Sequence, residues 1–182
     1  MRWRRAEACS KRGGSAGRLA TNIACDSTAA LYWQLEASLP PPPAEDIALV
    51  FLDSDVVGVT PAPIAGAGYL DELDLKNETF TVVGYGTDAF ITGSAASPKA
   101  ITVFDGIRSY REVTAIPARD AFPDRFLKIT AGVCFGDSGG PLFHEDTVVA
   151  INTWTFSYRC DGPNLEYRVD SSTAQAFLGL YL

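Results

Sequence analysis

Short apolar runs separated by clusters of glycine, proline and aspartate are the feature that most limits what this chain can fold into. The runs with the length and residue types of strands are Ile47–Leu52, Thr79–Tyr85, Ala100–Phe104, Tyr110–Ile116, Phe126–Thr130, Val148–Trp154 and Leu165–Val169. A last stretch, Ser172–Tyr181, has the apolar spacing of a short helix, which Ser171 or Ser172 could cap. The sequence therefore predicts an all-β protein, a barrel or a sandwich, that ends in a helix.

Charge divides the chain into two parts. Residues 1–18 hold six of the 15 Lys and Arg residues but one of the 22 Asp and Glu residues, so an acidic body follows a basic start. We expect residues 1–18 to be a disordered leader; a nucleic-acid-binding or transit segment is the alternative. The acidic body argues against binding of nucleic acid by the globular part. No apolar run is long enough to span a membrane, and no secretory signal is visible.

The segment 136–141, Gly-Asp-Ser-Gly-Gly-Pro, carries the clearest chemical signal. A serine hydroxyl is a weak nucleophile, and its attack on a carbonyl creates an oxyanion that needs hydrogen-bond donors. Gly136 lets the chain turn so that the N–H groups of Gly136 and Ser138 can point into one oxyanion hole. An ordinary glycine-rich turn with a polar tip is the other interpretation of these residues.

The wider segment 134–142, Cys-Phe-Gly-Asp-Ser-Gly-Gly-Pro-Leu, resembles the active-serine segment of the trypsin and chymotrypsin family. Residues 46–52, 81–86, 148–154 and 160–169 resemble other segments of that family, in its order and with its approximate spacing. The resemblance covers roughly residues 45–182. It implies a chymotrypsin-like double β-barrel with a C-terminal helix. The protease domain would span residues 19–182, with a partial first barrel over 19–75 and the second barrel over 76–182.

The resemblance also implies residue roles. Ser138 would be the nucleophile, Asp46 would orient the general-base histidine, and Gly136 and Ser138 would form the oxyanion hole. Cys134 and Cys160 would form a disulfide. Taken by its position alone, Asp46 could instead make a turn contact at the start of a strand. The implied protein is a secreted, monomeric serine endopeptidase that acts on a protein or peptide substrate and needs no cofactor or metal.

A substrate pocket is implied around Gly132, Val133, Thr153, Trp154, Thr155 and Asn164. Gly132 at its base supplies no carboxylate for a buried basic side chain, and Thr155 should narrow the pocket. We therefore expect an uncharged residue before the scissile bond, small to medium apolar first and aromatic second. If Glu166 points inward, a preference for basic residues returns.

The general-base histidine is the missing part. The family order is His, Asp, Ser, but the only histidine, His144, lies six residues after Ser138. It can be up to roughly 20 Å away along a strand, and we expect it in a solvated hairpin turn. Glu7-Ala8-Cys9 would put Ala8 at the histidine position, or the chain starts downstream of the domain start. A catalytically inert, protease-like binding module and a non-functional fragment are therefore the alternatives.

Two expectations concern the remaining cysteines and Asp137. Cys9 and Cys25 could pair or stay free, and four cysteines favour an oxidising compartment. The family buries the aspartate before its serine against an amine released by activation cleavage. No such cleavage site occurs here, so we expect Asp137 either to be buried at a cost or to rearrange the loop.

Overall fold

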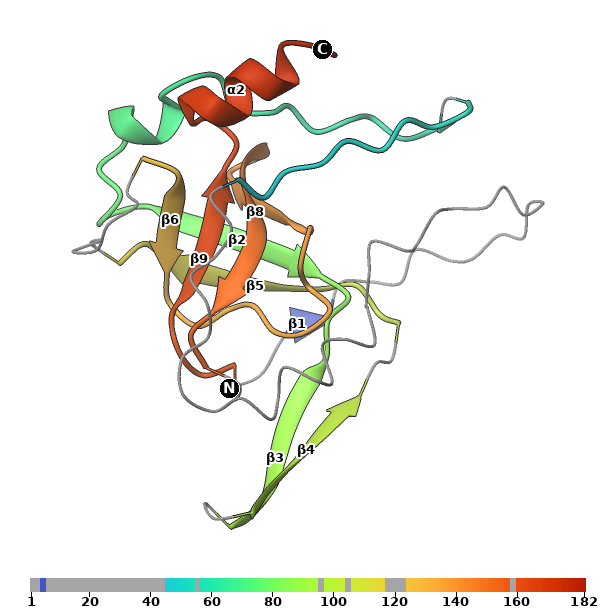
Figure 1. The fold of residues 1–182 in the computed structure, drawn as a ribbon, viewed down its shortest axis with the longest axis vertical. Helices are drawn as coiled ribbons and strands as arrows, with labels where there is room; N and C mark the ends of the chain where they lie inside the picture. Colours follow the sequence, from blue (N-terminus) through green and yellow to red (C-terminus); the bar gives the residue numbers. More distant parts are fainter. Residues whose placement is uncertain are drawn as a thin grey trace.

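The computed structural model describes residues 4–5, 45–54, 56–94, 97–103, 106–116, 124–157 and 160–182. Within them, a seven-stranded antiparallel sheet has the order β1-β5-β2-β7-β8-β9-β6 (Figure 1). Its strands are β1 (Arg4–Arg5), β2 (Thr79–Gly84), β5 (Ser109–Thr114), β6 (Phe126–Ile129), β7 (Pro141–His144), β8 (Thr147–Thr155) and β9 (Asn164–Arg168). A separate hairpin, β3 (Asp88–Ser94) and β4 (Ser97–Val103), extends from this sheet.

The sheet curls until its two ends meet. An antiparallel bridge pairs Ala115, just after β5, with Ile129 at the end of β6. Two backbone hydrogen bonds flank it, Ile116 N–H to Lys128 O at 2.8 Å and Thr130 N–H to Thr114 O at 3.0 Å. Strands β5, β2, β7, β8, β9 and β6 therefore form a closed barrel, which leaves few unpaired backbone groups at its edges.

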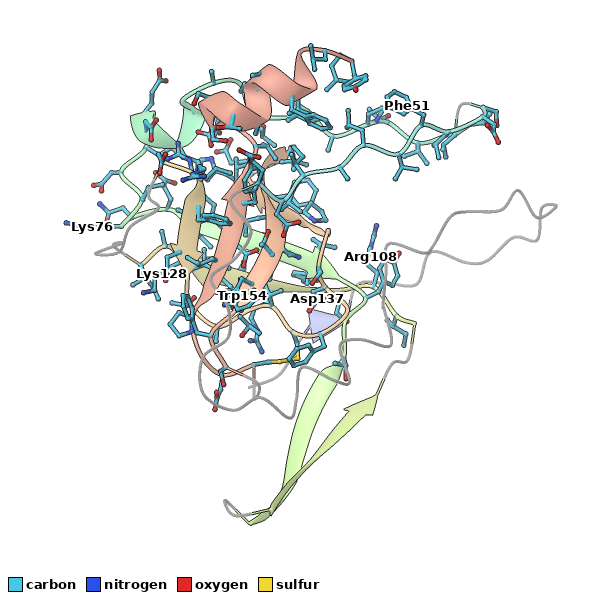
Figure 2. All side chains as sticks on the ribbon, viewed as in Figure 1. Phe51, Lys76, Arg108, Lys128, Asp137 and Trp154 are labelled. Atoms are coloured by element: carbon cyan, nitrogen blue, oxygen red, sulfur yellow. A yellow bond between two sulfur atoms is a disulfide. The ribbon has the colours of Figure 1, made fainter. Side chains whose placement is uncertain are left out.

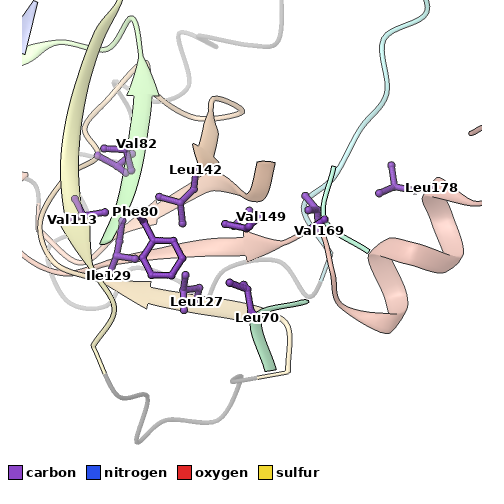
Figure 3. Close-up of a cluster of buried hydrophobic side chains, with 13 residues drawn as sticks. Leu70, Phe80, Val82, Val113, Leu127, Ile129, Leu142, Val149, Val169 and Leu178 are labelled. Carbon is purple, nitrogen blue, oxygen red and sulfur yellow. The ribbon is translucent and has the colours of Figure 1, made fainter. Parts of the chain in front are cut away.

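Alternation along the strands fills the barrel. In β2, Phe80 and Val82 are buried, while Thr79, Thr81 and Val83 are more exposed. The largest core cluster (Figure 3) consists of Ala65, Leu70, Phe80, Val82, Val113, Leu127, Ile129, Val133, Leu142, Val149, Ala150, Val169 and Leu178. Since it draws on several strands, the helix and the segment before β2, it ties these elements into one unit.

The predicted C-terminal helix is present as α2 (Ser172–Leu178). The Ser171 hydroxyl accepts a hydrogen bond from Ala174 N–H at 3.2 Å and is the N-cap. Ala174 and Leu178 are buried against the barrel, which confirms the predicted apolar face at these two positions. Among the described residues, no helix is long and apolar enough to cross a membrane.

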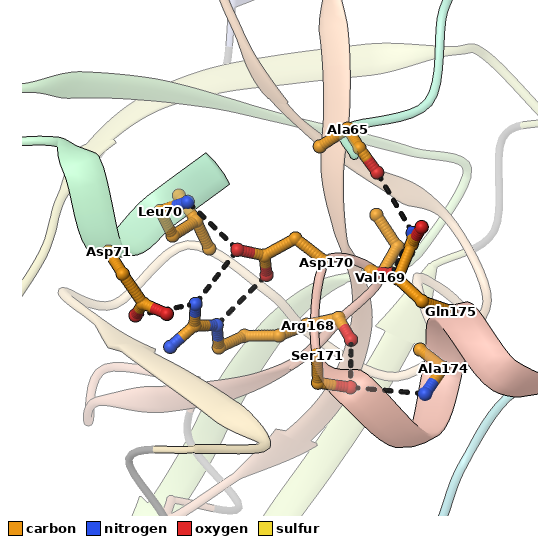
Figure 4. A network of polar contacts seen from close by, with 9 residues as sticks. All are labelled: Ala65, Leu70, Asp71, Arg168, Val169, Asp170, Ser171, Ala174 and Gln175. Carbon is orange, nitrogen blue, oxygen red and sulfur yellow. Dashed lines mark hydrogen bonds and ion pairs between the residues drawn. The ribbon is translucent and has the colours of Figure 1, made fainter. Parts of the chain in front are cut away.

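A buried ionic cluster fixes the short 3-10 helix η1 (Tyr69–Glu72) to the end of β9 (Figure 4). The Arg168 guanidinium donates to both Asp170 carboxylate oxygens, at 2.9 and 2.8 Å, and to Asp71 Oδ1 at 2.8 Å. Asp170 Oδ2 also accepts from Leu70 N–H at 2.8 Å. Arg168 and Asp170 are buried, and mutual hydrogen bonding offsets their desolvation.

The predicted first strand, Ile47–Leu52, is wrong. Residues 45–54 and 56–64 belong to a segment that leaves the barrel and returns to it (cyan in Figure 1). None of these residues lies in a strand longer than one bridge. Ile47 and Leu49 pack on the core, but Val50, Phe51 and Leu52 are exposed. The run lacks a neighbouring strand on either side among the described residues, so its backbone cannot join a ladder.

Other strand predictions agree with the structure to within a few residues, apart from β3, which the sequence did not indicate. Arg4 and Arg5 of the expected leader pair with β5 as β1. The rest of residues 1–18, including Ala8 and Cys9, lies outside the described residues, and so does Cys25.

Candidate active site

The serine loop consists of two consecutive four-residue turns. Asp137 N–H donates to Cys134 O at 3.1 Å, and Gly140 N–H donates to Asp137 O at 2.9 Å. The third residue of each turn is a glycine with positive φ, 93° at Gly136 and 81° at Gly139. This is the glycine position of a type II turn, where the positive φ would strain a residue with a side chain. Ser138 sits at the corner of the second turn.

The orientation of the first turn is set by a residue from another strand connection. Thr87 N–H donates to Phe135 O at 2.8 Å. In a trans peptide the C=O and the following N–H point in opposite directions, so this bond turns Gly136 N–H away from Thr87. Within the described part of the chain, neither Gly136 N–H nor Ser138 N–H donates to another residue. Both donors are therefore available for an oxyanion.

Asp137 is buried beneath the loop, where backbone amides bind it. Its Oδ1 accepts from Gly86 N–H at 2.7 Å and its Oδ2 accepts from Cys134 N–H at 2.9 Å. A side-chain carbon at Gly84 or at Gly86 would overlap the Asp137 carboxylate. Both glycines therefore make room for this group. The loop stays folded over a buried Asp137 because hydrogen bonds from these N–H groups stabilise the negative charge of its carboxylate.

Strand β8 holds the other side of the serine loop. Gly139 N–H donates to Asn152 O at 2.9 Å, and Asn152 N–H donates to Gly140 O at 2.8 Å. The Asn152 side-chain amide adds hydrogen bonds to Asp137 O at 3.3 Å and to Val83 O at 3.2 Å. Figure 2 labels Asp137 and, two residues beyond Asn152, Trp154. No role for Asn152 was predicted from the sequence. An asparagine within an otherwise apolar strand was the one local sign that its side chain makes specific hydrogen bonds.

Asp46 lies at the start of the segment that packs on the barrel. Partial burial raises the pKa of the Asp46 carboxyl above its ordinary value, and a hydrogen bond with the Thr153 side chain opposes that shift. The Thr153 hydroxyl is also 3.0 Å from Ile151 O. Since Thr153 follows Asn152, Asp46 and the serine loop contact successive residues of β8.

The expected pocket residues adjoin one another on two neighbouring segments. Asn164 Oδ1 accepts from Gly132 N–H at 2.9 Å and from Val133 N–H at 3.2 Å. The disulfide between Cys134 and Cys160, with Cα atoms 5.2 Å apart, is the pair that the resemblance implies. Asn164 is fully buried, and its amide joins the segment before the serine loop to β9.

Thr153, Trp154 and Thr155, the other expected pocket residues, lie at the end of β8. Trp154 pairs with Leu165, Thr155 pairs with Asn164, and a bulge lies between Asn152 and Trp154. At this bulge Thr153 N–H donates to Glu166 Oε2 at 3.2 Å. Glu166 does point into the interior and is fully buried.

The expectation that His144 occupies a solvated turn is wrong. His144 ends β7 and is 7% exposed, and the turn consists of Glu145 and Asp146. Alternation along β7 puts His144 on the same inward face as Leu142. Its Nδ1 lies 2.8 Å from Tyr69 Oη and its Nε2 lies 3.0 Å from Glu78 Oε2. Both ring nitrogens are thus engaged away from Ser138.

The described residues contain no group of three or more His, Cys, Asp or Glu side chains arranged to hold a metal ion. The chemistry available at the site is that of a hydroxyl beside two free backbone donors, with a carboxylate on the neighbouring segment.

Comparisons with known proteins give a family from one family model and a fold from one superposition. The family model described as Trypsin matches residues 29–177. A mutant of human heparin binding protein superposes with a TM-score of 0.51 at 18% identity, over 70% of this chain and 52% of that one. The atomic-resolution structure of HBP gives 0.49 at 18% identity, over 71% and 54%. A scabies mite inactivated protease paralogue gives 0.46 at 16% identity, over 70% and 55%.

The chain spans about half the length of these solved structures. At this level of identity the first of them shows the fold and nothing further. No curated protein matches the sequence.

Proposed function

The chain belongs to the trypsin family and is a serine protease-like protein; from that premise we propose that its site is that of a serine endopeptidase with Ser138 as the nucleophile. Asp46 is the carboxylate that orients a general base, and the N–H groups of Gly136 and Ser138 form the oxyanion hole. The substrate is a protein or peptide, and the reaction proceeds through an acyl-enzyme.

One observation carries this proposal. Strand β8 receives the serine loop at Asn152 and the Asp46 side chain at Thr153, the next residue. These groups come from segments about ninety residues apart in the sequence. An ordinary glycine-rich turn would give no reason for a carboxylate from a distant segment to contact the same strand.

The reaction follows from this arrangement. Ser138 Oγ attacks the peptide carbonyl carbon while its proton passes to the base. The carbonyl oxygen becomes an oxyanion, which Gly136 N–H and Ser138 N–H stabilise. Breaking of the C–N bond releases the amine, which takes the proton, and leaves an acyl group on Ser138. Water then removes the acyl group by the same steps.

The base is the part that this sequence does not supply, because its single histidine is bound to Tyr69 and Glu78. General-base catalysis contributes typically about 10²–10⁴-fold. That observation favours a second candidate function, a protease-like binding module that uses the same site without cutting.

For the substrate, we propose an uncharged, small to medium apolar side chain before the scissile bond. Asn164 binds the backbone of Gly132 and Val133. Glu166 does point inward, but it is fully buried, and burial raises the pKa of its carboxyl well above the ordinary value. Glu166 therefore does not offer a ready negative charge to a basic side chain. The disulfide supports an extracellular, oxidising location, and we propose a monomer.

Labelling of Ser138 by a fluorophosphonate tests the proposal on the chain as it exists. Free imidazole, added to the solution, can act as the general base. We expect slow labelling of Ser138 that imidazole accelerates, recovering part of the roughly 10²–10⁴-fold contribution of a base. Ser138→Ala is the control and should not label. Labelling that is as slow as in urea-denatured protein, with or without imidazole, contradicts the protease proposal and supports the binding module.

A further inference from the structure

Among the buried side-chain atoms of the described residues that have no hydrogen-bond partner are Asn152 Oδ1 and Glu166 Oε1. Their residues are 1% and 0% exposed, so bulk water does not reach them. Asn152 and Glu166 are also direct partners in the β8–β9 ladder. Side chains of directly opposed residues lie on the same face of a sheet, with Cβ atoms about 4.5–5.5 Å apart. The two orphan oxygens therefore face the same space.

The orientation of the Asn152 amide is fixed by its other contacts. Its Nδ2 donates to Val83 O at 3.2 Å and to Asp137 O at 3.3 Å. A flipped amide would aim its oxygen at two carbonyl oxygens, which cannot donate. Asn152 Oδ1 is therefore an acceptor, and a protonated carboxyl on Glu166, its direct partner in the ladder, would give it a donor.

The surroundings of Glu166 favour the protonated form. Burial raises the pKa of Glu166 well above its ordinary value; the hydrogen bond from Thr153 N–H opposes this, and the charge of Asp137 adds to it. Leu127, the partner on β6, is apolar. Arg168, two residues along β9 on the same face, binds Asp170 and Asp71.

We propose that Glu166 donates its carboxyl proton to Asn152 Oδ1 and is thereby a positioning residue for the serine loop. Its second oxygen accepts from Thr153 N–H, so one neutral carboxyl binds both residues of β8 that hold the site. Asn152 in turn holds the serine loop in place through its hydrogen bonds with Gly139 N–H, Gly140 O and Asp137 O. The effect of Glu166 on the reactivity of Ser138 rests on the proposed function, whereas the protonation of Glu166 does not depend on it.

A neutral Glu166 makes stability fall as pH rises. Below the ordinary pKa of glutamate, about 4.3, both folded and unfolded chains are protonated. Above it the unfolded chain ionises while the folded chain keeps its proton, which favours unfolding until the pH reaches the raised pKa of the folded state. Above that pKa, Glu166 ionises beside Asp137, and the bond to Asn152 is lost.

Glu166→Gln is the matched variant, because glutamine keeps the shape, donates through its NH₂ to Asn152 Oδ1 and accepts from Thr153 N–H. Urea denaturation of both proteins between pH 4 and pH 9 gives their unfolding constants. We expect the ratio of wild type to variant to rise with pH, by up to about tenfold per unit above pH 4.3. A ratio that stays constant or falls would overturn the proposal.

A second measurement needs no variant to fold. The wild-type protein labelled with ¹³C at glutamate side-chain carboxyls should show one carboxyl that stays protonated at pH 7. Full ionisation of all glutamates at pH 7 would contradict the proposal.

The positioning role has its own readout, the pH profile of fluorophosphonate labelling at Ser138. We expect labelling of the wild type to drop where the ¹³C signal shows Glu166 ionising, and the drop to be absent in Glu166→Gln. Identical profiles would refute the positioning role. If Ser138 labels in neither protein while the unfolding ratio rises with pH, the proton on Glu166 stands and the protease proposal fails.

Discussion

Two apolar runs of the same length, 47–52 and 79–84, end in opposite environments. In β2, Phe80 and Val82 are 0% and 1% exposed, between β5 and β7. In the other run, Val50 and Phe51 are 56% and 71% exposed, on a segment that extends away from the barrel (Figure 2). The comparison teaches that a strand-like run becomes a strand only where neighbours pair its backbone and cover one face.

The segment is nevertheless attached at both ends. Ile47 and Leu49 pack on the core near Asp46, and Leu70 is buried where the segment returns as η1. Between these points, its apolar side chains contribute little to the packing of the barrel. The barrel should therefore tolerate change in the middle of the segment much better than change at either the core or the attachment points.

The largest expected contrast is between two phenylalanines. Phe80→Ala removes a fully buried ring that packs on His144 and should cost about 3–5 kcal/mol in unfolding free energy. Phe51→Ala removes an exposed ring whose edge contacts Tyr181 and should cost about 1 kcal/mol or less. Urea denaturation of both variants measures the contrast, and equal losses would mean that the segment is packed as tightly as the core.

The next contrast concerns the two acidic partners of Arg168. Asp170→Asn leaves a buried guanidinium without its main charge partner and should cost about 3 kcal/mol. Asp71 is largely exposed, so Asp71→Asn should cost under about 1 kcal/mol. Thermal and urea denaturation report both values. Equal losses of stability in the two variants would mean that the Arg168–Asp170 ion pair is no more important for holding η1 than the exposed Arg168–Asp71 ion pair.

The smallest contrast compares two glycines. Gly86→Ala forces a methyl group against the Asp137 carboxylate and should cost about 1–3 kcal/mol, with slower labelling of Ser138. Gly66→Ala, in the returning segment, meets no atom within 4 Å and should be close to neutral. Stability and labelling are measured on both variants. Unchanged labelling in Gly86→Ala would show that Asp137 does not support the loop.

Local patterns in the sequence predicted much of this molecule. The serine loop was found from its six-residue motif, and Gly136, which was expected to let the chain turn, does have a positive φ. The helix was found through its apolar spacing and a cap at Ser171 or Ser172, and the structure has the cap at Ser171. β3 was missed because Asp88, Thr92, Gly93 and Ser94 make its sequence look like a connection rather than a strand.

The errors involve residues whose environment depends on distant parts of the chain. His144 follows a strand and precedes a polar pair, which favours a turn, yet Tyr69, Glu78 and Phe80 enclose it. Glu166 gave no local sign that its carboxyl is buried against β8. The convergence of Asp46 and the serine loop on β8 could be expected only through the family resemblance.

The sequence by itself determined local conformation, including the turns of the serine loop, because turns, caps and strand periodicity depend on residues close together in the chain. Only the tertiary structure decided which apolar run is buried, which histidine nitrogens are engaged and which glutamate carboxyl is buried. Burial, pairing and charge at those positions are set by residues between about fifteen and one hundred positions away, and folding alone brings them into contact.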